Sequence, residues 1–261
     1  MRKVTILRSI RKFYQFFVDI PFKEGAVLNE RYEVLSVIGT GSYGIIYRCK
    51  DLKTNDIIGI KQLRPSKRRN KKEIALFENE ISILRKLNHK NMPALYEAFL
   101  DNEHLFYVMS FIEGENLEEL IFLKKKTFNE KESLLFLINL LELIDYLHQK
   151  DIYHGDLRIP NILLCNNQPF LIDFGLSKQS SLSIDMKKQD YYDLGEILLF
   201  LLYTTYPSKS KKALPWTEEL SIEMETTHLL KKLLQVNGSY STIQDISADL
   251  LAAIKANEKM H

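Results

Sequence analysis

The pattern of hydrophobic and polar residues divides the chain into a strand-rich part and a helical part. Between residues 32 and 109, short apolar runs alternate with glycines or with Asp, Asn and Thr turn signals, which is typical of strands joined by turns. These runs are residues 32–38, 45–50, 57–63, 94–100 and 104–109. From residue 116 onwards, helical patterns dominate.

One helix is expected within the strand-rich part, over residues 69–87. Its apolar residues recur at helical spacing, so they would share one face. They are Ile74, Phe77, Ile81, Leu84 and Leu87. A β-rich part followed by a helical part predicts an α+β chain with two segregated lobes, the first holding one main helix and the second being largely helical.

Two apolar stretches in the helical part are expected to be buried helices rather than membrane spans. Residues 134–147 are interrupted by Asn139, Glu142 and Asp145. Residues 197–203 are far too few to cross roughly 30 Å of hydrocarbon.

Composition narrows the class of protein. The 261 residues are 45% hydrophobic and 27% charged, as in an ordinary soluble globular protein. A net charge of +2 argues neither for nor against a nucleic-acid partner, and we expect none. Cys49 and Cys165 are the only cysteines, so a disulfide framework or a structural zinc site is not expected, and a cytoplasmic location fits.

Basic residues gather at residues 64–72, 124–126 and 209–212. The first cluster leads into the predicted helix and would be able to steer an acidic substrate. Solvated surface is the commoner role of such runs, and we expect it for all three.

Residues 1–22 form a distinct N-terminal segment. Within residues 1–18, five basic residues share the segment with apolar residues at near-helical spacing, and no acid precedes Asp19. No uninterrupted apolar run follows, so the segment is not a secretory signal. Such a helix would either bind an anionic membrane surface or pack its apolar stripe on the body of the same protein. We favour the second interpretation.

Three glycines cluster in residues 39–44, between two predicted strands. This context disfavours the dinucleotide-binding fold, in which such a turn opens a helix. A glycine-rich turn between strands lets backbone N–H groups approach phosphates closely, because no Cβ intervenes. Alone the motif is weak, since glycine turns are common in hairpins.

Lys61 ends an apolar strand pattern, where a lysine is costly to bury without a partner. Glu80, on the predicted helix, is the candidate partner. The pair would hold the ammonium where it binds phosphates, whereas a lysine on an edge strand would extend into solvent instead.

Residues 153–163 and 170–175 carry the strongest chemical signal. Asp156 is able to accept the proton of an attacking hydroxyl, and Arg158 to neutralise a moving phosphoryl group. Asn161 and Asp173 offer the hard oxygen ligands that Mg²⁺ prefers.

In order and spacing, these motifs resemble the signature set of the eukaryotic-like protein kinases. The match runs from about residue 31 to about residue 203. The chain is similar in particular to the small bacterial Ser/Thr kinase-like proteins, which consist of little beyond the catalytic core. The resemblance implies a bilobal fold, with an N-lobe of residues 23–112 and a C-lobe of residues 113–261.

The resemblance also implies that ATP binds in a cleft between the lobes with Mg²⁺ or Mn²⁺. Asp156 would be the catalytic base, assisted by Arg158, Lys61 and Glu80, and Asn161 and Asp173 would hold the metal. The nucleotide would contact Ile38, Gly39, Gly41, Ser42, Gly44, Ile46, Gly59, Lys61, Met109, Ser110, Ile112, Asn116 and Leu163.

Several of these positions have specific implied roles. Met109 falls at the gatekeeper position, backbone groups of Ser110 and Ile112 would bond adenine, and Asn116 falls at the ribose position. Asp190 matches the buried helix residue that anchors the catalytic loop. Leu84, His154 and Phe174 match the hydrophobic stack of the family.

The chain departs from the family pattern in four places. Gly155 replaces an arginine that reads a phosphate on the activation loop, so phosphorylation-driven ordering is not expected. Only residues 176–189 separate Asp-Phe-Gly from the Asp190 helix, and no Ala-Pro-Glu motif is present. Tyr240 stands near the position of the arginine that would pair with the missing glutamate. Arg158 replaces a lysine and keeps its charge.

Four serines of the short segment, Ser177, Ser180, Ser181 and Ser183, are candidates for autophosphorylation, although a solvated serine-rich loop is commoner. We expect a Ser/Thr protein kinase that acts on a protein substrate. A small-molecule kinase and a nucleotide-binding pseudokinase that serves as an interaction module remain alternatives.

Overall fold

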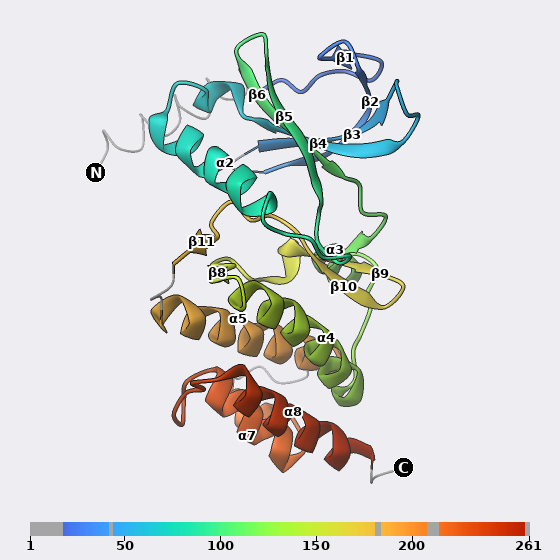
Figure 1. The fold of residues 1–261 in the computed structure, drawn as a ribbon. Coiled ribbons are helices and arrows are strands. Elements are labelled where there is room, and N and C mark those ends of the chain that lie inside the picture. Colours follow the sequence, from blue (N-terminus) through green and yellow to red (C-terminus); the bar gives the residue numbers. More distant parts are fainter. Residues whose placement is uncertain (1–17, 42–43, 181–183, 208–213, 259–261) are drawn as a thin grey trace, which may run out of the picture. The chain divides into compact units, whose positions relative to one another are not determined.

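The computed structural model describes residues 18–41, 44–180, 184–207 and 214–258. The chain forms two compact units, Met1–Ile112 and Glu113–His261 (Figure 1). The first holds one large sheet and one main helix, and the second is mainly helical. The expected α+β class with its β-rich and helical parts is confirmed.

Six antiparallel strands make up the sheet of the first unit, in the order β1-β2-β3-β4-β6-β5. Every strand predicted from the hydrophobic pattern is present, within two residues at each end. The strands are β1 (Val27–Leu28), β2 (Tyr32–Thr40), β3 (Gly44–Asp51), β4 (Ile57–Leu63), β5 (Leu95–Asp101) and β6 (His104–Ser110).

A short 3-10 helix, η1 (Pro65–Lys67), and the helix α2 (Lys71–Leu84) connect β4 to β5. The helix α2 begins later than predicted because the side chain of Asn70 caps it, accepting a hydrogen bond from the amide of Lys72 at 3.1 Å. It packs on the sheet through Phe77, whose ring centroid lies 5.2 Å from that of Tyr107 on β6.

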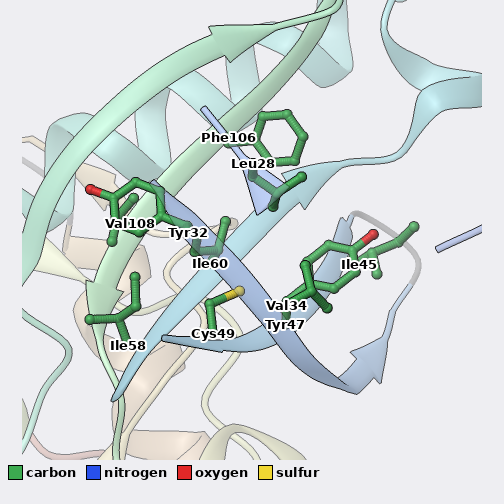
Figure 2. Packing of buried hydrophobic residues seen from close by; sticks show 10 residues of the cluster. All are labelled: Leu28, Tyr32, Val34, Ile45, Tyr47, Cys49, Ile58, Ile60, Phe106 and Val108. Carbon is green, nitrogen blue, oxygen red and sulfur yellow. The ribbon is translucent and has the colours of Figure 1, made fainter. Parts of the chain in front are cut away.

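The core of the first unit lies on the sheet and is contributed by β1, β2, β3, β4 and β6. Figure 2 shows ten of its side chains. They recur at every second position along their strands, so they share one face of the sheet. They are Leu28, Tyr32, Val34, Ile45, Tyr47, Cys49, Ile58, Ile60, Phe106 and Val108.

In the second unit, the helix α4 (Glu130–His148) contacts both α5 (Ile184–Tyr203) and α8 (Ile243–Glu258). A capping box between Asn129 and Glu132 begins α4. The two apolar stretches lie within α4 and α5, and no helix in the described part of the chain is long and apolar enough to cross a bilayer. The remaining helices are α3 (Leu117–Phe122), α6 (Trp216–Glu219) and α7 (Met224–Leu233).

Two small sheets in the second unit position the segments that contain Asp156, Asn161 and Asp173. One has the order β10-β9-β7 and the other pairs β11 with β8. Their strands are β7 (Glu115–Asn116), β8 (Ile152–Tyr153), β9 (Ile162–Cys165), β10 (Gln168–Leu171) and β11 (Lys178–Gln179), and a 3-10 helix, η2 (Ile159–Asn161), precedes β9.

The first basic cluster, residues 64–72, is not solvated surface throughout, which corrects our expectation. Arg64 pairs with Asp19 at 3.0 Å and its side chain is 19% exposed, while Lys67 pairs with Glu73 at 3.0 Å and is 10% exposed. Both acids lie outside the cluster, so the cluster alone gave no sign of them. Residues 1–17 and 209–212 lie outside the described residues.

Candidate active site

An ion pair between Lys61 and Glu80 lies inside the first unit. The Nζ atom of Lys61 on β4 is 2.7 Å from Oε1 and 2.8 Å from Oε2 of Glu80 on α2. The two side chains are 5% and 3% exposed. Burial at this level requires pairing, so the carboxylate holds the ammonium at a fixed place on the sheet.

The predicted glycine-rich turn connects β2 to β3. Thr40 and Ile45 form the last pair of the two strands, and Gly39 pairs with Ile46. A Cβ on Gly44 would lie 2.8 Å from the carbonyl oxygen of Gln62 and 3.2 Å from the Lys61 side chain. Glycine is therefore required for the close approach of β3 to β4 beside Lys61. Ser42 lies outside the described residues.

Outside the glycine-rich turn and apart from Ile112, the residues of the first unit predicted to contact the nucleotide lie on β2, β3, β4 and β6. Gly59 pairs with Met109 across β4 and β6, and a Cβ on Gly59 would lie 3.3 Å from the Met109 side chain. Ile46 is half-buried and Ile38 is exposed. The amide of Ser110 donates to the carbonyl of Ala94 at 2.9 Å, so an adenine contact at Ser110 would use its carbonyl. Ile112 is the last residue of this unit.

In the second unit, Asp156 is held by two neighbours. The Asn161 Nδ2 atom donates to the Asp156 carbonyl at 2.8 Å and to its carboxylate Oδ2 at 3.0 Å. The Nε atom of Arg158 lies 3.2 Å from the same Oδ2, on a side chain that is 61% exposed. The carboxylate of Asp156 is 27% exposed, so it is oriented by the protein and still accessible to a hydroxyl.

Asn161 and Asp173 come together through the backbone, because the amide of Ile172 donates to the Asn161 carbonyl at 3.0 Å. The side-chain Nδ2 atom of Asn161 donates to Asp156. The Oδ1 atom of Asn161 is therefore the one available to bind a cation. Asp173 has a positive φ of 61° and accepts from the amide of Gly175 at 3.3 Å. A carboxylate and an amide oxygen are a donor set that fits Mg²⁺ or Mn²⁺.

Asp190 anchors the loop that carries Asp156, in the place the resemblance implied. It is fully buried on α5, and its carboxylate accepts from the amides of His154 at 3.1 Å and Gly155 at 3.0 Å. The Nε2 atom of His148 lies 2.8 Å from it. No sequence motif marks His148, which simply ends an apolar helix pattern.

His154 and Phe174 pack against each other with ring centroids 5.3 Å apart. Burial lowers the pKa of His154 below its usual range, against the opposing charges of Asp190, Asp173 and Asp156. The imidazole is therefore neutral at neutral pH and serves as a packing group beneath the loop.

Gly155 occupies a backbone position that disfavours any side chain. Its φ is +72°, and a Cβ there would lie 3.0 Å from the carbonyl oxygen of Leu176. Ser177 is 1% exposed and its hydroxyl donates to the carbonyl of His154 at 3.0 Å. Our expectation of Ser177 as an autophosphorylation candidate is therefore wrong, because its hydroxyl is buried. Ser180 is exposed, and Ser181 and Ser183 lie outside the described residues.

Two other predicted positions have local structural roles in the second unit. Asn116 caps α3, accepting from the amide of Glu118 at 2.9 Å, and donates to the carbonyl of Pro160 at 2.8 Å. Its ribose contact stays a prediction. Leu163 on β9 pairs with Asn116 and with Phe170 and is half-buried.

Tyr240, at the position of the missing arginine, belongs to a local cluster. Its hydroxyl donates to Asp249 at 2.6 Å, and the ammonium of Lys232 lies 4.1 Å from its ring centroid and 2.8 Å from Asp249. Asp249 therefore has two donors from the neighbouring helix and loop, and α7 and α8 are joined without an arginine at this position.

Comparison with known proteins identifies relatives among the protein kinases. A model of the protein kinase domain matches residues 32–193. The chain is 41% identical over 253 residues to a probable serine/threonine-protein kinase of Bacillus subtilis (strain 168), YbdM, covering 95% of this chain and 99% of that protein.

Less similar relatives match over a smaller share of the chain. Cyclin-dependent kinase F-3 of Oryza sativa subsp. japonica is 31% identical over 173 residues, covering 65% of this chain and 39% of that protein. Myosin light chain kinase 3 of Danio rerio is 32% identical over 157 residues, covering 58% of this chain and 22% of that protein. The chain thus spans nearly all of the Bacillus protein and well under half of the other two.

Proposed function

The chain belongs to the protein kinase family, and we propose that it is a Ser/Thr protein kinase that transfers the γ-phosphate of metal-bound ATP to a protein hydroxyl. The observation that carries the proposal is the carboxylate of Asp156, which is held by Asn161 and remains accessible. The high coverage of a probable serine/threonine-protein kinase supports this acceptor class.

In the proposed reaction, the acceptor hydroxyl oxygen forms a bond to the γ-phosphorus and the bond to the β–γ bridging oxygen breaks. ADP leaves with the electron pair of that bond, and the hydroxyl proton passes to Asp156. The hydrogen bond from Asn161 fixes the direction of the accepting oxygen. Arg158, which is mostly exposed, would stabilise the charge that develops on the phosphoryl oxygens.

Asn161 Oδ1 and the Asp173 carboxylate would hold a divalent cation, for which we propose Mg²⁺, with Mn²⁺ as the alternative. A bound cation of this kind neutralises phosphate charge. Two protein ligands are few for such an ion, and Mg²⁺ commonly completes its coordination with water and substrate phosphates.

The first unit would bind the nucleotide. We propose that Lys61, fixed by Glu80, contacts the phosphates and that the turn containing Gly39, Gly41 and Gly44 covers them. Adenine would lie near the Gly59–Met109 strand pair and bond backbone groups of Ser110 and Ile112. Strand pairing fixes the backbone of Gly44 at the end of the turn and of Gly59 and Met109 beside the proposed adenine position.

One observation favours a small-molecule acceptor as the second candidate. Only residues 176–189 separate the Asp-Phe-Gly motif from Asp190, so little chain is present to dock an extended peptide. A pseudokinase is disfavoured by the paired Lys61 and Glu80 and the oriented Asp156, since a purely structural domain has no physical need for them.

The test uses purified protein with labelled ATP and Mg²⁺, with and without a generic Ser/Thr acceptor protein. Transfer to protein should fall by at least about 100-fold in Asp156→Asn and in Asp173→Asn. A matched control is Asp185→Asn, an exposed carboxylate of the same unit. Turnover that requires a metabolite would favour the second candidate, and nucleotide binding without transfer would indicate a pseudokinase.

We further propose a cytoplasmic location without a nucleic-acid partner. For residues 1–18 we favour packing on the protein body, with peripheral contact with an anionic membrane as the alternative. Five basic residues and no acid before Asp19 support the contact. If the segment binds membrane, deletion of residues 1–18 should release the protein from anionic vesicles in a co-sedimentation assay. Unchanged binding would favour packing of this segment on the protein body.

A further inference from the structure

Arg64 connects the N-terminal segment to the glycine-rich turn within the first unit. Its Nε atom donates to the carbonyl oxygen of Gly41 at 2.6 Å, and its Nη1 atom donates to the carboxylate of Asp19 at 3.0 Å. The two partners are 23 and 45 residues away in sequence. One guanidinium thus bonds two separate segments.

Strand register explains why Arg64 reaches the turn. Leu63, the last residue of β4, pairs with Gly44, the first residue of β3, so the next residue along the chain lies beside the turn. The last pair of β2 and β3 is Thr40 with Ile45, and Gly41 follows that pair outside the ladder. Its carbonyl therefore takes its hydrogen bond from Arg64.

Asp19 fixes the guanidinium in this orientation. Its carboxylate accepts from the amide of Ser66 at 2.8 Å, from the hydroxyl of Ser66 at 2.9 Å and from Arg64. The Asp19 side chain is 3% exposed. Both members of the pair are held in place. Ser66 binds Asp19, and Pro65 restricts the backbone that follows Arg64.

We propose that Arg64 is a positioning residue for nucleotide binding, which restrains the glycine-rich turn and is itself oriented by Asp19. This inference rests on the proposed binding of ATP phosphates by that turn. Glycines carry the largest backbone entropy cost on ordering, so a charge-assisted bond that orders Gly41 beforehand raises affinity for the nucleotide. Asp19 also neutralises the guanidinium of Arg64 next to the turn. Without Asp19, this guanidinium would be attracted to phosphate.

The first test measures the KM for ATP, kcat and the melting temperature of Arg64→Gln, Arg64→Lys and Asp19→Asn. Arg64→Gln should raise the KM for ATP about fivefold to tenfold, with kcat changing less than about twofold. The KM for ATP of Arg64→Lys should lie between those of the unaltered protein and Arg64→Gln, because an ammonium lacks the planar fork that bonds two acceptors at once. Asp19→Asn should have no further effect in the Arg64→Gln background, since it acts through Arg64.

Arg31→Gln is the matched control. Arg31 makes a similar two-bond pair with Asp51 in the same unit, at 2.9 and 2.6 Å, without a bond to the turn. Its loss should lower the melting temperature and leave the KM for ATP unchanged. A KM shift of the same size in Arg31→Gln, or none in any Arg64 variant, would show that Arg64 has only a structural role.

Hydrogen exchange without nucleotide separates this inference from the proposed function. Amides of the β2–β3 turn should exchange faster in Arg64→Gln and Asp19→Asn than in the unaltered protein and in Arg31→Gln. If the unaltered protein does not bind ATP, the proposed function and this inference both fail. If it binds ATP and the variants match it in both assays, only the inference is overturned.

Discussion

The hydroxyl of Ser177 donates a hydrogen bond of 3.0 Å to the backbone carbonyl of His154. This bond ties the segment after the Asp-Phe-Gly motif to the catalytic loop, and the pairing of β11 with β8 continues the contact. The hydroxyl and the carbonyl are both neutral, so this hydrogen bond forms without a phosphate group. The same loop carries Gly155 where the family has a phosphate-reading arginine, which is consistent with a contact at Ser177 that forms without phosphorylation.

Ser177→Ala should lower kcat several-fold. The substitution leaves the buried carbonyl of His154 without this donor, at a cost of about 1 kcal/mol, and loosens the loop that carries Asp156. Steady-state kinetics and urea denaturation measure the two effects. Ser180→Ala, at an exposed position of the same segment, should change neither. A Ser177→Asp variant that is more active than the unaltered protein would contradict this account.

Restoring the family's arginine by Gly155→Arg should inactivate and destabilise the protein. The positive φ of 72° and the 3.0 Å approach of the Leu176 carbonyl penalise any Cβ, so Gly155→Ala alone should cost about 1–3 kcal/mol. Differential scanning calorimetry and a kinase assay test both variants. Full stability in Gly155→Ala would mean that Leu176 shifts freely, and the strain argument would then be wrong.

Replacing Lys61 alone should destabilise the first unit more than replacing both members of its ion pair. Lys61→Met leaves the carboxylate of Glu80, 3% exposed, without its main counter-charge, at a cost of about 3 kcal/mol. The double variant Lys61→Met/Glu80→Leu removes both charges and should recover part of that loss. Urea denaturation measures the difference. Additive losses would indicate that the two side chains do not act as a pair.

Asp193 should make the protein less stable as pH rises through about 6. Burial on α5 raises the pKa of Asp193 from 3.8 to about 6, although a hydrogen bond from Gln189 opposes the shift. The folded state therefore holds this proton more tightly than the unfolded state. The associated stability is full below the unfolded pKa and disappears above the folded one.

The control for this pH effect is Asp193→Asn, which keeps the shape and cannot ionise. After discounting for partial solvation, its free energy of unfolding relative to the unaltered protein should rise by about 1–2 kcal/mol between about pH 4 and about pH 7.5. Denaturation at the two pH values measures this difference. Parallel pH dependence of the two proteins would show that another group is responsible.

Local sequence pattern predicted the helices and strands well, and it also singled out the candidate site residues. The strands from Tyr32 to Ser110 were evident because each is a short apolar run bounded by glycine or by turn residues. Asp156, Asn161 and Asp173 were evident because each lies within a short motif of fixed spacing, as do the glycines of the turn. Their proposed roles in catalysis and binding remain for the assays above.

The sequence by itself therefore determined the family, the order of strands and helices, and the identity of the polar groups near the reaction, since these depend on neighbours in the chain. Only the tertiary structure decided that Arg64 bonds Gly41 and Asp19, and that Ser177, within a run of similar serines, is the buried one. Those facts depend on partners 23 to 45 residues away. Hydrogen bonds between distant segments are set by how the elements pack, and no local periodicity records them.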